Sequence, residues 1–533
     1  MENFPVPREG FLRLRNFPRS REFLGQSTPT AMLPQADHSW TIFEAAHLLN
    51  RAGFGGSPSD IKAFHALGRE QAVDSLIAPT ESLDAFPLPA WSTDEIALAD
   101  MRKRMEQRKT IQQAMRNLSP EEAEKVKREA NKESQMEDRQ RALEAQAWWF
   151  RRMLKTAAPL REKMTLFWHD HFATSIQKVK QPVLLIRQNE LFRQNGFGSS
   201  KDLTQAILMD PAMMLYLDTQ SSKKGMPNEN FAREVMELFT LGEGNYTEQD
   251  VREAARAFTG YQLNRVTGKV FHDKRQWDST DKTVFGKTGP FTGQDVINRI
   301  FEKKEAARFM AKKLWEFFVY ENPSAGALDA LATSFQKANF QTGPLLREIF
   351  LSKEFYAEAS IRSQIKSPVQ YLIGLLKQLE ITDPPTGFPI TAEQQLGQVL
   401  FMPPNVAGWD WGQAWINTNT LLTRYNLAGF LTKGAGQADQ PMADAKMKAP
   451  GAKRMGRSWQ GPDYEKIAPR KLREIPTDLV DSLIFRFFQS PLPDKSRSSF
   501  IEYAAAKKGV VFTNKETAEL CHLILSTPNY QLC

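Results

Sequence analysis

The chain is poor in cysteine and lacks several common catalytic signatures. Its 533 residues include two cysteines, Cys521 and Cys533. Two thiols cannot build a disulfide framework or a cysteine-based zinc site, and the count alone leaves a single bridge in the C-terminal tail open. No glycine-rich phosphate loop, G-x-S-x-G elbow, H-E-x-x-H motif or fixed-period repeat is present. The nucleotide-binding, α/β-hydrolase, zinc-peptidase and solenoid classes that these motifs mark are therefore not expected.

Long apolar runs are also missing. Mean hydropathy is −0.47, and no stretch is apolar over the length that a bilayer requires, so no membrane-spanning helix is predicted. The N-terminus carries scattered arginines and no apolar central segment, unlike a secretory signal. This absence predicts a cytoplasmic protein, with export left open.

Charge of one sign is in mild excess, with 70 basic against 62 acidic residues and a net charge of +8. The densest basic run, residues 446–473, lies in a segment rich in Gly, Ala, Lys and Pro. A nucleic-acid-binding protein concentrates its positive charge on one face, which such a linker does not provide. Nucleic acid is therefore not an expected partner.

What is present is helical periodicity along most of the chain. Residues 42–52, for example, place Ile42, Ala45, Ala46 and Leu49 on one helix face. The pattern predicts a mainly α fold, a large multi-helix globular body with irregular loops rich in Gly, Pro and Trp. The expected order is an extended or disordered N-terminus (1–38), a main helical domain (39–433), a flexible basic linker (434–475) and a C-terminal helical segment packed on the main domain (476–533).

Two segments of the main domain stand apart. Residues 93–157 are highly charged, and Ser119-Pro120 interrupts and restarts the helical pattern, which predicts a long helical arm or hairpin. The arm is either a solvated helix pair or a surface for a protein partner. Residues 262–293 are polar and glycine-rich, and we expect a long functional loop there.

Residues 228–261 carry the most specific local pattern, two capped helices joined by a loop with two glycines. One face of the first helix is apolar, and Asn230, Arg233, Glu234 and Glu237 fall on the other. Two carboxylates one turn apart can hold a metal between helices. The alternative is an exposed face on which Arg233 and Glu237 form an ion pair.

Residues 162–175 contain His169, Asp170 and His171 among aromatic neighbours. On a strand or an irregular turn, two histidines two positions apart point the same way, whereas on a regular helix they diverge. An unpaired imidazole in apolar surroundings is costly. The triplet therefore predicts either a metal site or a hydrogen-bonded core network.

Residues 401–431 form a third distinctive stretch. A Pro-Pro-Asn sequence and Gly408 predict a loop, and the tryptophans Trp409, Trp411 and Trp415 crowd it. Indole rings beside amides suit stacking on a sugar or base ring, and they suit a loop that seals the core equally well.

Together, HLLNRAGFG (47–55), EKMTLFWHDHFATS (162–175), residues 228–261, DKTVFGKTGPFTGQDVI (281–297), residues 400–428 and the ending LCHLILSTPNYQLC resemble the bacterial domain of unknown function 1800 family. The resemblance implies a mostly helical bacterial protein and brings no reaction. The family pattern matches His169, His171, residues 228–230, Arg233, Glu234, Glu237, Asn405 and Trp409. The family's His-Asp pair aligns with Trp277-Asp278 here, while His272 lies five residues earlier, so its role is in doubt.

The first functional hypothesis is a metal-dependent hydrolase or oxidoreductase. His169, His171 and Glu234 would bind zinc, iron or manganese, and Arg233 and Glu237 would act on the substrate. Binding roles are predicted for Asn230, Asp278, Asn405 and Trp409. The alternative is a non-catalytic scaffold or partner-binding protein in which the same side chains form a buried structural network.

Overall fold

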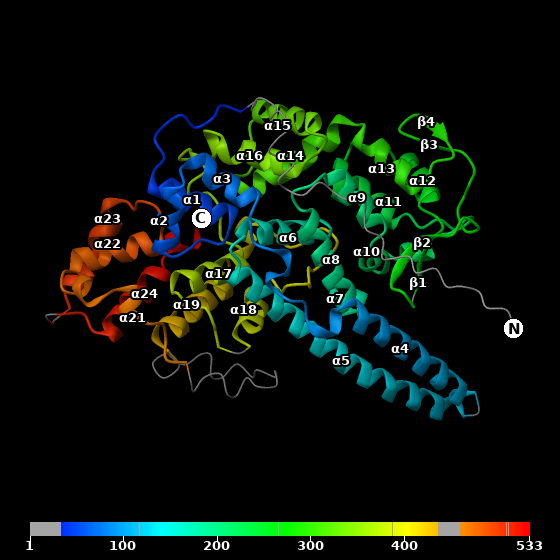
Figure 1. Ribbon diagram of the computed structural model, residues 1–533, viewed down its shortest axis with the longest axis horizontal. Coiled ribbons are helices and arrows are strands. Elements are labelled where there is room, and N and C mark those ends of the chain that lie inside the picture. The colour runs from blue at the N-terminus through cyan, green and yellow to red at the C-terminus, as the bar shows by residue number, and fades with distance from the viewer. Residues whose placement is uncertain are drawn as a thin grey trace.

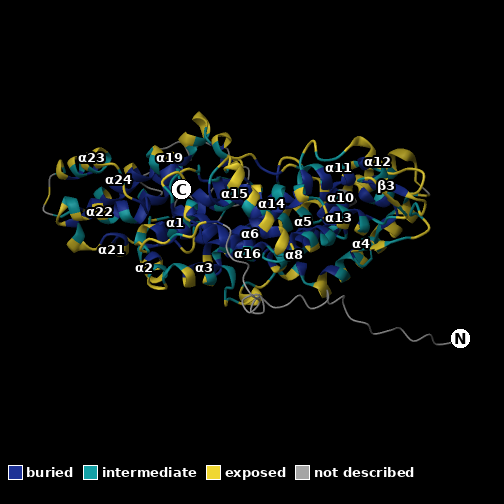
Figure 2. Ribbon diagram, turned by 90° about the horizontal axis from the view of Figure 1, so that it is seen from above, coloured by how far each residue is buried: buried dark blue, intermediate teal, exposed yellow. Residues whose placement is uncertain are grey.

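The computed structural model describes residues 33–434 and 459–533, apart from residues 117, 265, 386, 508 and 510. Over these residues the chain is built of helices, and its strands form two short antiparallel ribbons. The predicted mainly α class is confirmed. The body is elongated, buried residues run along its middle, and one helical hairpin projects from it (Figures 1 and 2).

The N-terminal helices are α1 (Ile42–Ala52), α2 (Pro58–Ala66) and α3 (Arg69–Ile77). Thr41 and Ser57 begin α1 and α2 with reciprocal capping boxes. The face of α1 that was predicted to be apolar is mostly buried. Upstream of α1, the amide of Ala36 bonds to the carbonyl of Leu351 at 3.0 Å, so this part of the expected extended N-terminus lies against the body. The rest of that segment, 1–32, is outside the described residues.

The charged region folds as the helical hairpin α4 (Asp94–Met115) and α5 (Pro120–Lys155). Ser119 caps α5 through a capping box. Between the helices, Arg104 pairs with Asp138 at 2.8 Å, and Arg141 pairs with Asp100 at 2.8 Å. The two helices are thus joined through polar side chains rather than an apolar seam.

The central helices surround a buried ion network. Glu162 accepts hydrogen bonds from Arg193 Nε at 2.6 Å and from Arg152 Nε at 2.8 Å, and all three side chains are buried. This network ties α5, α6 and α8 together. The elements of this region are α6 (Pro159–His171), α7 (Ile176–Val179), α8 (Pro182–Asn195), α9 (Ser200–Leu208), α10 (Pro211–Tyr216), α11 (Asn230–Met236), the π-helix η5 (Glu237–Leu241) and α12 (Glu248–Ala257).

The polar segment predicted as a long loop contains both ribbons. Strand β1 (Tyr261–Asn264) pairs with β2 (Lys269–His272), and β3 (Lys282–Val284) pairs with β4 (Lys287–Gly289). Each ribbon is antiparallel. The segment is therefore more ordered than its composition indicates.

The remaining helices complete the body around a continuous apolar core. Residues 435–458 of the predicted linker are outside the described residues, but Tyr464 and Ile467 downstream of them are buried in α21, unlike a flexible linker. The helices are α13 (Gly293–Phe301), α14 (Lys304–Phe318), α15 (Ala325–Lys337), α16 (Thr342–Leu351), α17 (Pro368–Gln378), α18 (Phe388–Leu396), α19 (Thr418–Lys433), α21 (Tyr464–Ile467), α22 (Pro476–Phe487), α23 (Asp494–Ala505) and α24 (Asn514–Leu525).

The two cysteines, Cys521 and Cys533, are buried as free thiols, so the bridge that the count left open is not formed. None of the helices formed by the described residues is long and apolar enough to cross a membrane.

Candidate active site

Helix α6 ends in His169, Asp170 and His171 and stays helical through the last of them. A turn was one of the geometries that the sequence allowed here, and the structure shows a helix, which Pro159 opens in its first turn. Residues two positions apart on a helix point about 200° apart. The two imidazoles therefore diverge, and each side chain has its own surroundings.

His169 lies in an aromatic pocket. Its side chain is fully buried, and the rings of Trp149, Phe401 and Trp409 have centroids 5.4, 5.4 and 5.7 Å from its own. Neither ring nitrogen has a hydrogen-bond partner among the described residues. Burial lowers the pKa of His169 to about 3, so the ring is neutral at pH 7. In this arrangement His169 fills space in the core.

Asp170 faces the loop that follows α18. Its Oδ1 accepts a hydrogen bond from the backbone N–H of Trp409 at 2.7 Å. Gly408 permits this approach, because a Cβ at that position would overlap the Asp170 carboxylate. Burial raises the pKa of Asp170 to about 7, while the Trp409 hydrogen bond and the charge of Lys313 act in the opposite direction. Its protonation state therefore changes near neutral pH.

Two backbone carbonyls at the C-terminal end of the π-helix η5 accept hydrogen bonds from side chains. The N–H of Gly242 reaches back six residues instead of bonding to Leu238. The carbonyl of Leu238 accepts a hydrogen bond from Lys313 Nζ at 3.4 Å, and that of Phe239 accepts one from His171 Nε2 at 3.0 Å. Single π-turns of this kind occur often at functional sites.

Lys313 of α14 joins His171 to Asp170 electrostatically. Because His171 Nε2 donates, Nδ1 is an acceptor, and Lys313 Nζ lies 3.3 Å from it. Burial and the charge of Lys313 hold the pKa of His171 well below its usual value. Burial also lowers the pKa of Lys313, against the charge of Asp170. We call Asp170, His171 and Lys313 the acid–base cluster.

Glu234 and Glu237 are half-buried on the same stretch of chain as the two free carbonyls. Glu237 accepts a hydrogen bond from the hydroxyl of Tyr246. Burial and the charge of Glu237 raise the pKa of Glu234. Segments 162–175 and 228–241 therefore meet as predicted, but they meet through the backbone carbonyl of Phe239 rather than through these carboxylates.

Arg233 and Asn230, on the first turn of α11, reach the protein surface. Arg233 pairs with Glu248 at 2.7 Å and with Glu229 at 3.3 Å, so the ion pair with Glu237 that the spacing allowed is not formed. Asn230 is exposed. These two side chains are not part of a buried network.

The loop between α18 and α19 divides its predicted residues between surface and core. Asn405 is exposed, and its Oδ1 accepts a hydrogen bond from the N–H of Ala407 at 2.8 Å. Trp409 is buried against His169, and its indole N–H has no partner among the described residues. Trp409 thus seals the core, and Asn405 shapes the turn that leads to it.

Trp411 of the same loop is 50% exposed. Its ring lies edge-on to Phe317, with centroids 5.2 Å apart, and Phe317 follows Lys313 by one turn of α14. An exposed aromatic side chain therefore lies on the side of α14 that carries Lys313.

The polar segment holds Asp278 and His272 in contacts of their own. Although burial raises the pKa of Asp278, hydrogen bonds from Thr280 and Arg256 lower it to about 2. His272 Nε2 lies 3.3 Å from the carbonyl of Thr259. None of these contacts involves the acid–base cluster.

The predicted metal ligands do not assemble into a site. Over the part of the chain that the structure describes, no three His, Cys, Asp or Glu side chains gather in a way that could hold a metal ion. His169 and His171 point apart on α6, and Glu234 contacts neither. The zinc, iron or manganese cofactor stays a prediction without a matching donor set.

Sequence reasoning missed Lys313. The one available signal is its position within an apolar stripe of α14, three residues after Met310 and four before Phe317. A lysine at such a position is more often a side chain that reaches solvent along the helix surface. Nothing local distinguishes it from Lys312, which is exposed.

A family model described as "Protein of unknown function (DUF1800)" matches residues 47–532 of this chain, nearly its whole length. No curated protein and no solved structure matches it. The match confirms the resemblance carried by the sequence motifs.

Proposed function

The chain belongs to the DUF1800 family, and from its site we propose that it is an enzyme using general acid–base catalysis at Asp170 and Lys313. The observation that supports this proposal is the raised pKa of Asp170, about 7, beside a lysine whose pKa is lowered. A general acid or base is most effective when its pKa lies near the working pH. Perturbed groups of this kind gather at functional sites.

The two groups suit a proton-transfer reaction. Near pH 7 the Asp170 carboxyl exchanges a proton readily, and its second oxygen is free of hydrogen bonds from the described residues. Lys313 Nζ makes only two long contacts, to His171 and Leu238. Asp170 would take a proton from a nucleophile such as water, and Lys313 would stabilise developing negative charge. Of the two predicted classes, this chemistry favours a hydrolase.

The substrate would approach over Trp411. That side chain is half exposed and packs edge-on against Phe317, one turn from Lys313, and ring faces of sugars or bases stack on such side chains. Asn405, on the same loop, and Asn230, at the start of α11, are exposed polar groups that would contact the substrate. The predicted catalytic roles of Arg233 and Glu237 move in this proposal to the periphery of the site.

A scaffold without catalysis is the second candidate, and one observation favours it. Burial also raises the pKa of Asp210 to about 7 and that of Glu393 to about 8. Both carboxylates have structural roles, since Asp210 accepts the N–H of Met213 at 2.7 Å and Glu393 that of Leu400 at 3.1 Å. On this account Asp170 only anchors the loop between α18 and α19. A protein partner bound through the α4–α5 arm fits either candidate and remains a proposal.

Chromogenic 4-nitrophenyl esters, glycosides and phosphates test the enzyme. We expect turnover of at least one class, with kcat falling by roughly 10² or more in Asp170→Asn, the usual contribution of a general base. Asp410→Asn changes an exposed carboxylate on the loop that Asp170 anchors and serves as the matched control. Lys313→Met tests the role of the cation in the same way, and Lys312→Met, at the exposed neighbouring lysine, is its control. Turnover that survives Asp170→Asn within about threefold would contradict the proposal.

A further inference from the structure

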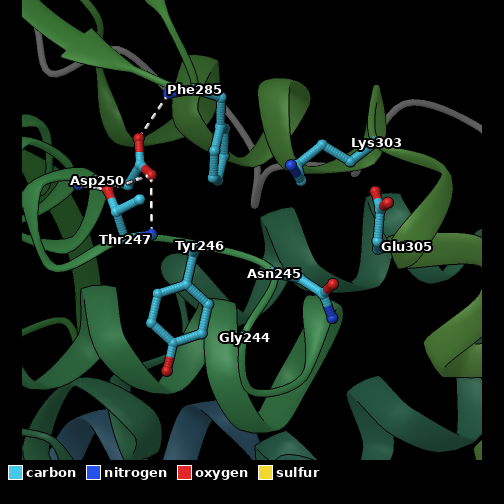
Figure 3. A pocket seen from close by; sticks show the side chains of 8 residues that line it. All are labelled: Gly244, Asn245, Tyr246, Thr247, Asp250, Phe285, Lys303 and Glu305. Carbon is cyan, nitrogen blue, oxygen red and sulfur yellow. Dashed lines mark hydrogen bonds between the residues drawn. The ribbon is translucent and has the colours of Figure 1, made fainter.

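A depression of about 430 Å³ lies beside Tyr246 (Figure 3). It is walled by the loop before α12, the turn between β3 and β4, and the chain entering α14. The lining residues are Gly244, Asn245, Tyr246, Thr247, Asp250, Phe285, Lys303 and Glu305.

Partly buried hydrogen bonds hold the walls of the pocket in place. Asp250 Oδ1 accepts the N–H of Phe285 at 2.7 Å, and its Oδ2 accepts the N–H of Thr247 at 3.0 Å. The amide of Asn245 donates to the carbonyl of Leu241 at 2.9 Å, which leaves its own oxygen free. The loop and the β-turn are therefore held in place without a ligand, as in a pre-formed binding pocket.

Besides Asp250, whose oxygens accept backbone N–H groups, two side chains of opposite charge line this pocket without an ion-pair partner among the described residues. Lys303 and Glu305 are both half-buried, and neither forms an ion pair within the described residues. Lys303 Nζ lies 4.9 Å from the ring centre of Phe285, and the Glu305 carboxylate extends into the same space (Figure 3). A ligand that carries one charge of each sign could therefore pair with both side chains at once.

We propose that the pocket binds a small zwitterion of the α-amino-acid type. Its carboxylate would pair with Lys303, its ammonium group with Glu305, and its apolar part would pack on Phe285 and Tyr246. A ligand with only one charge would leave the other side chain uncompensated in a partly desolvated site. A neutral sugar would satisfy neither charge fully.

The site is separate from the acid–base cluster. Glu305 and Lys313 are two turns apart on α14, and Phe309 lies between them, where its ring would be 3.1 Å from a Cβ at Gly242. Changes at Lys303 or Glu305 therefore test this pocket without altering Asp170 or Lys313.

Isothermal titration calorimetry of the full chain with leucine, N-acetyl-leucine and leucine amide tests the proposal. We expect leucine to bind with a Kd of roughly 1 mM or tighter, and each capped analogue to bind at least about tenfold more weakly, because each loses one ion pair. Lys303→Met should weaken leucine binding by at least about tenfold, and Glu305→Gln likewise. Lys304→Met, at an exposed neighbouring lysine, should change the Kd by less than about twofold.

Equal affinity for leucine and its capped forms would overturn the zwitterion assignment. So would glucose binding in place of leucine, or no heat with leucine, phenylalanine or glycine at about 10 mM ligand. Thermal melts of the three variants check that each is folded. None of these results changes the outcome of the Asp170 experiment.

Discussion

The backbone N–H of Trp409 donates a hydrogen bond to Asp170 across a separation of 239 residues. The bond connects the C-terminal end of α6 to the loop after α18, and that loop brings Trp411 beside α14. Asp170 is thus both an anchor for the loop and a titrating group that faces Lys313.

Gly408→Ala should be strongly destabilising. The new Cβ would overlap the Asp170 carboxylate, and Gly408 has φ +92°, which L side chains rarely adopt. Gly225 has φ +81° with nothing within 4 Å of a built Cβ, so Gly225→Ala isolates the backbone cost, about 1 kcal/mol. We expect Gly408→Ala to cost at least about 2 kcal/mol more in urea unfolding, from the steric overlap. Equal losses in the two variants would contradict the close approach.

Asp170→Asn should change how stability depends on pH. The folded-state pKa, about 7, lies above the unfolded value, so the unfolded state gives up its proton first as pH rises and the wild type loses stability between about pH 4 and 7. The cost above pH 7 is on the order of 4 kcal/mol at most. Asn cannot ionise, so the variant should melt higher than the wild type at pH 8, with a gap that closes towards pH 4. Parallel melting curves at all pH values would show that Asp170 has an ordinary pKa.

The two histidines of α6 should respond differently to the same change. His169→Leu removes no hydrogen bond and keeps a similar volume, so we expect a loss of less than about 1.5 kcal/mol. His171→Leu leaves the carbonyl of Phe239 without its donor and removes one of the two contacts of Lys313 Nζ, which costs roughly 1–3 kcal/mol more. Chemical denaturation of both variants measures the difference. A larger loss at His169 would mean that its ring has a partner.

The metal hypothesis has a direct measurement. Because His169, His171 and Glu234 form no common donor set, any metal that purified protein retains should be unaffected by His169→Ala or Glu234→Ala. Mass spectrometry of metal content per chain, on variants whose melts show a native fold, checks this. A stoichiometric metal that is lost in both variants would restore the site that the sequence predicted.

Local patterns were sufficient for most helices and their starts. Thr247 begins α12 with the capping box that its sequence predicts, and the inward face of that helix is buried. These features depend on neighbours a few positions away, which a sequence shows directly.

The site was harder to predict because it depends on contacts between distant segments. The sequence left the direction of His169 and His171 open between a turn and a helix, and the helix sends them apart. Arg233 forms an ion pair with Glu248, on the next helix, rather than with Glu237, which follows it in the same segment. Lys313 and the free carbonyls of η5 have no sequence signature, since both arise from how α6, α11 and α14 pack together.

The wide turn of η5 makes the cluster sensitive to chain length. Deleting one residue before Leu238 would rotate the following residues by about 100° about the helix axis relative to α11, so the carbonyls of Leu238 and Phe239 would turn away from α6 and α14. His171 and Lys313 would lose their acceptors in the same event. A one-codon deletion would thus remove the hydrogen bonds that His171 and Lys313 make to the backbone of η5.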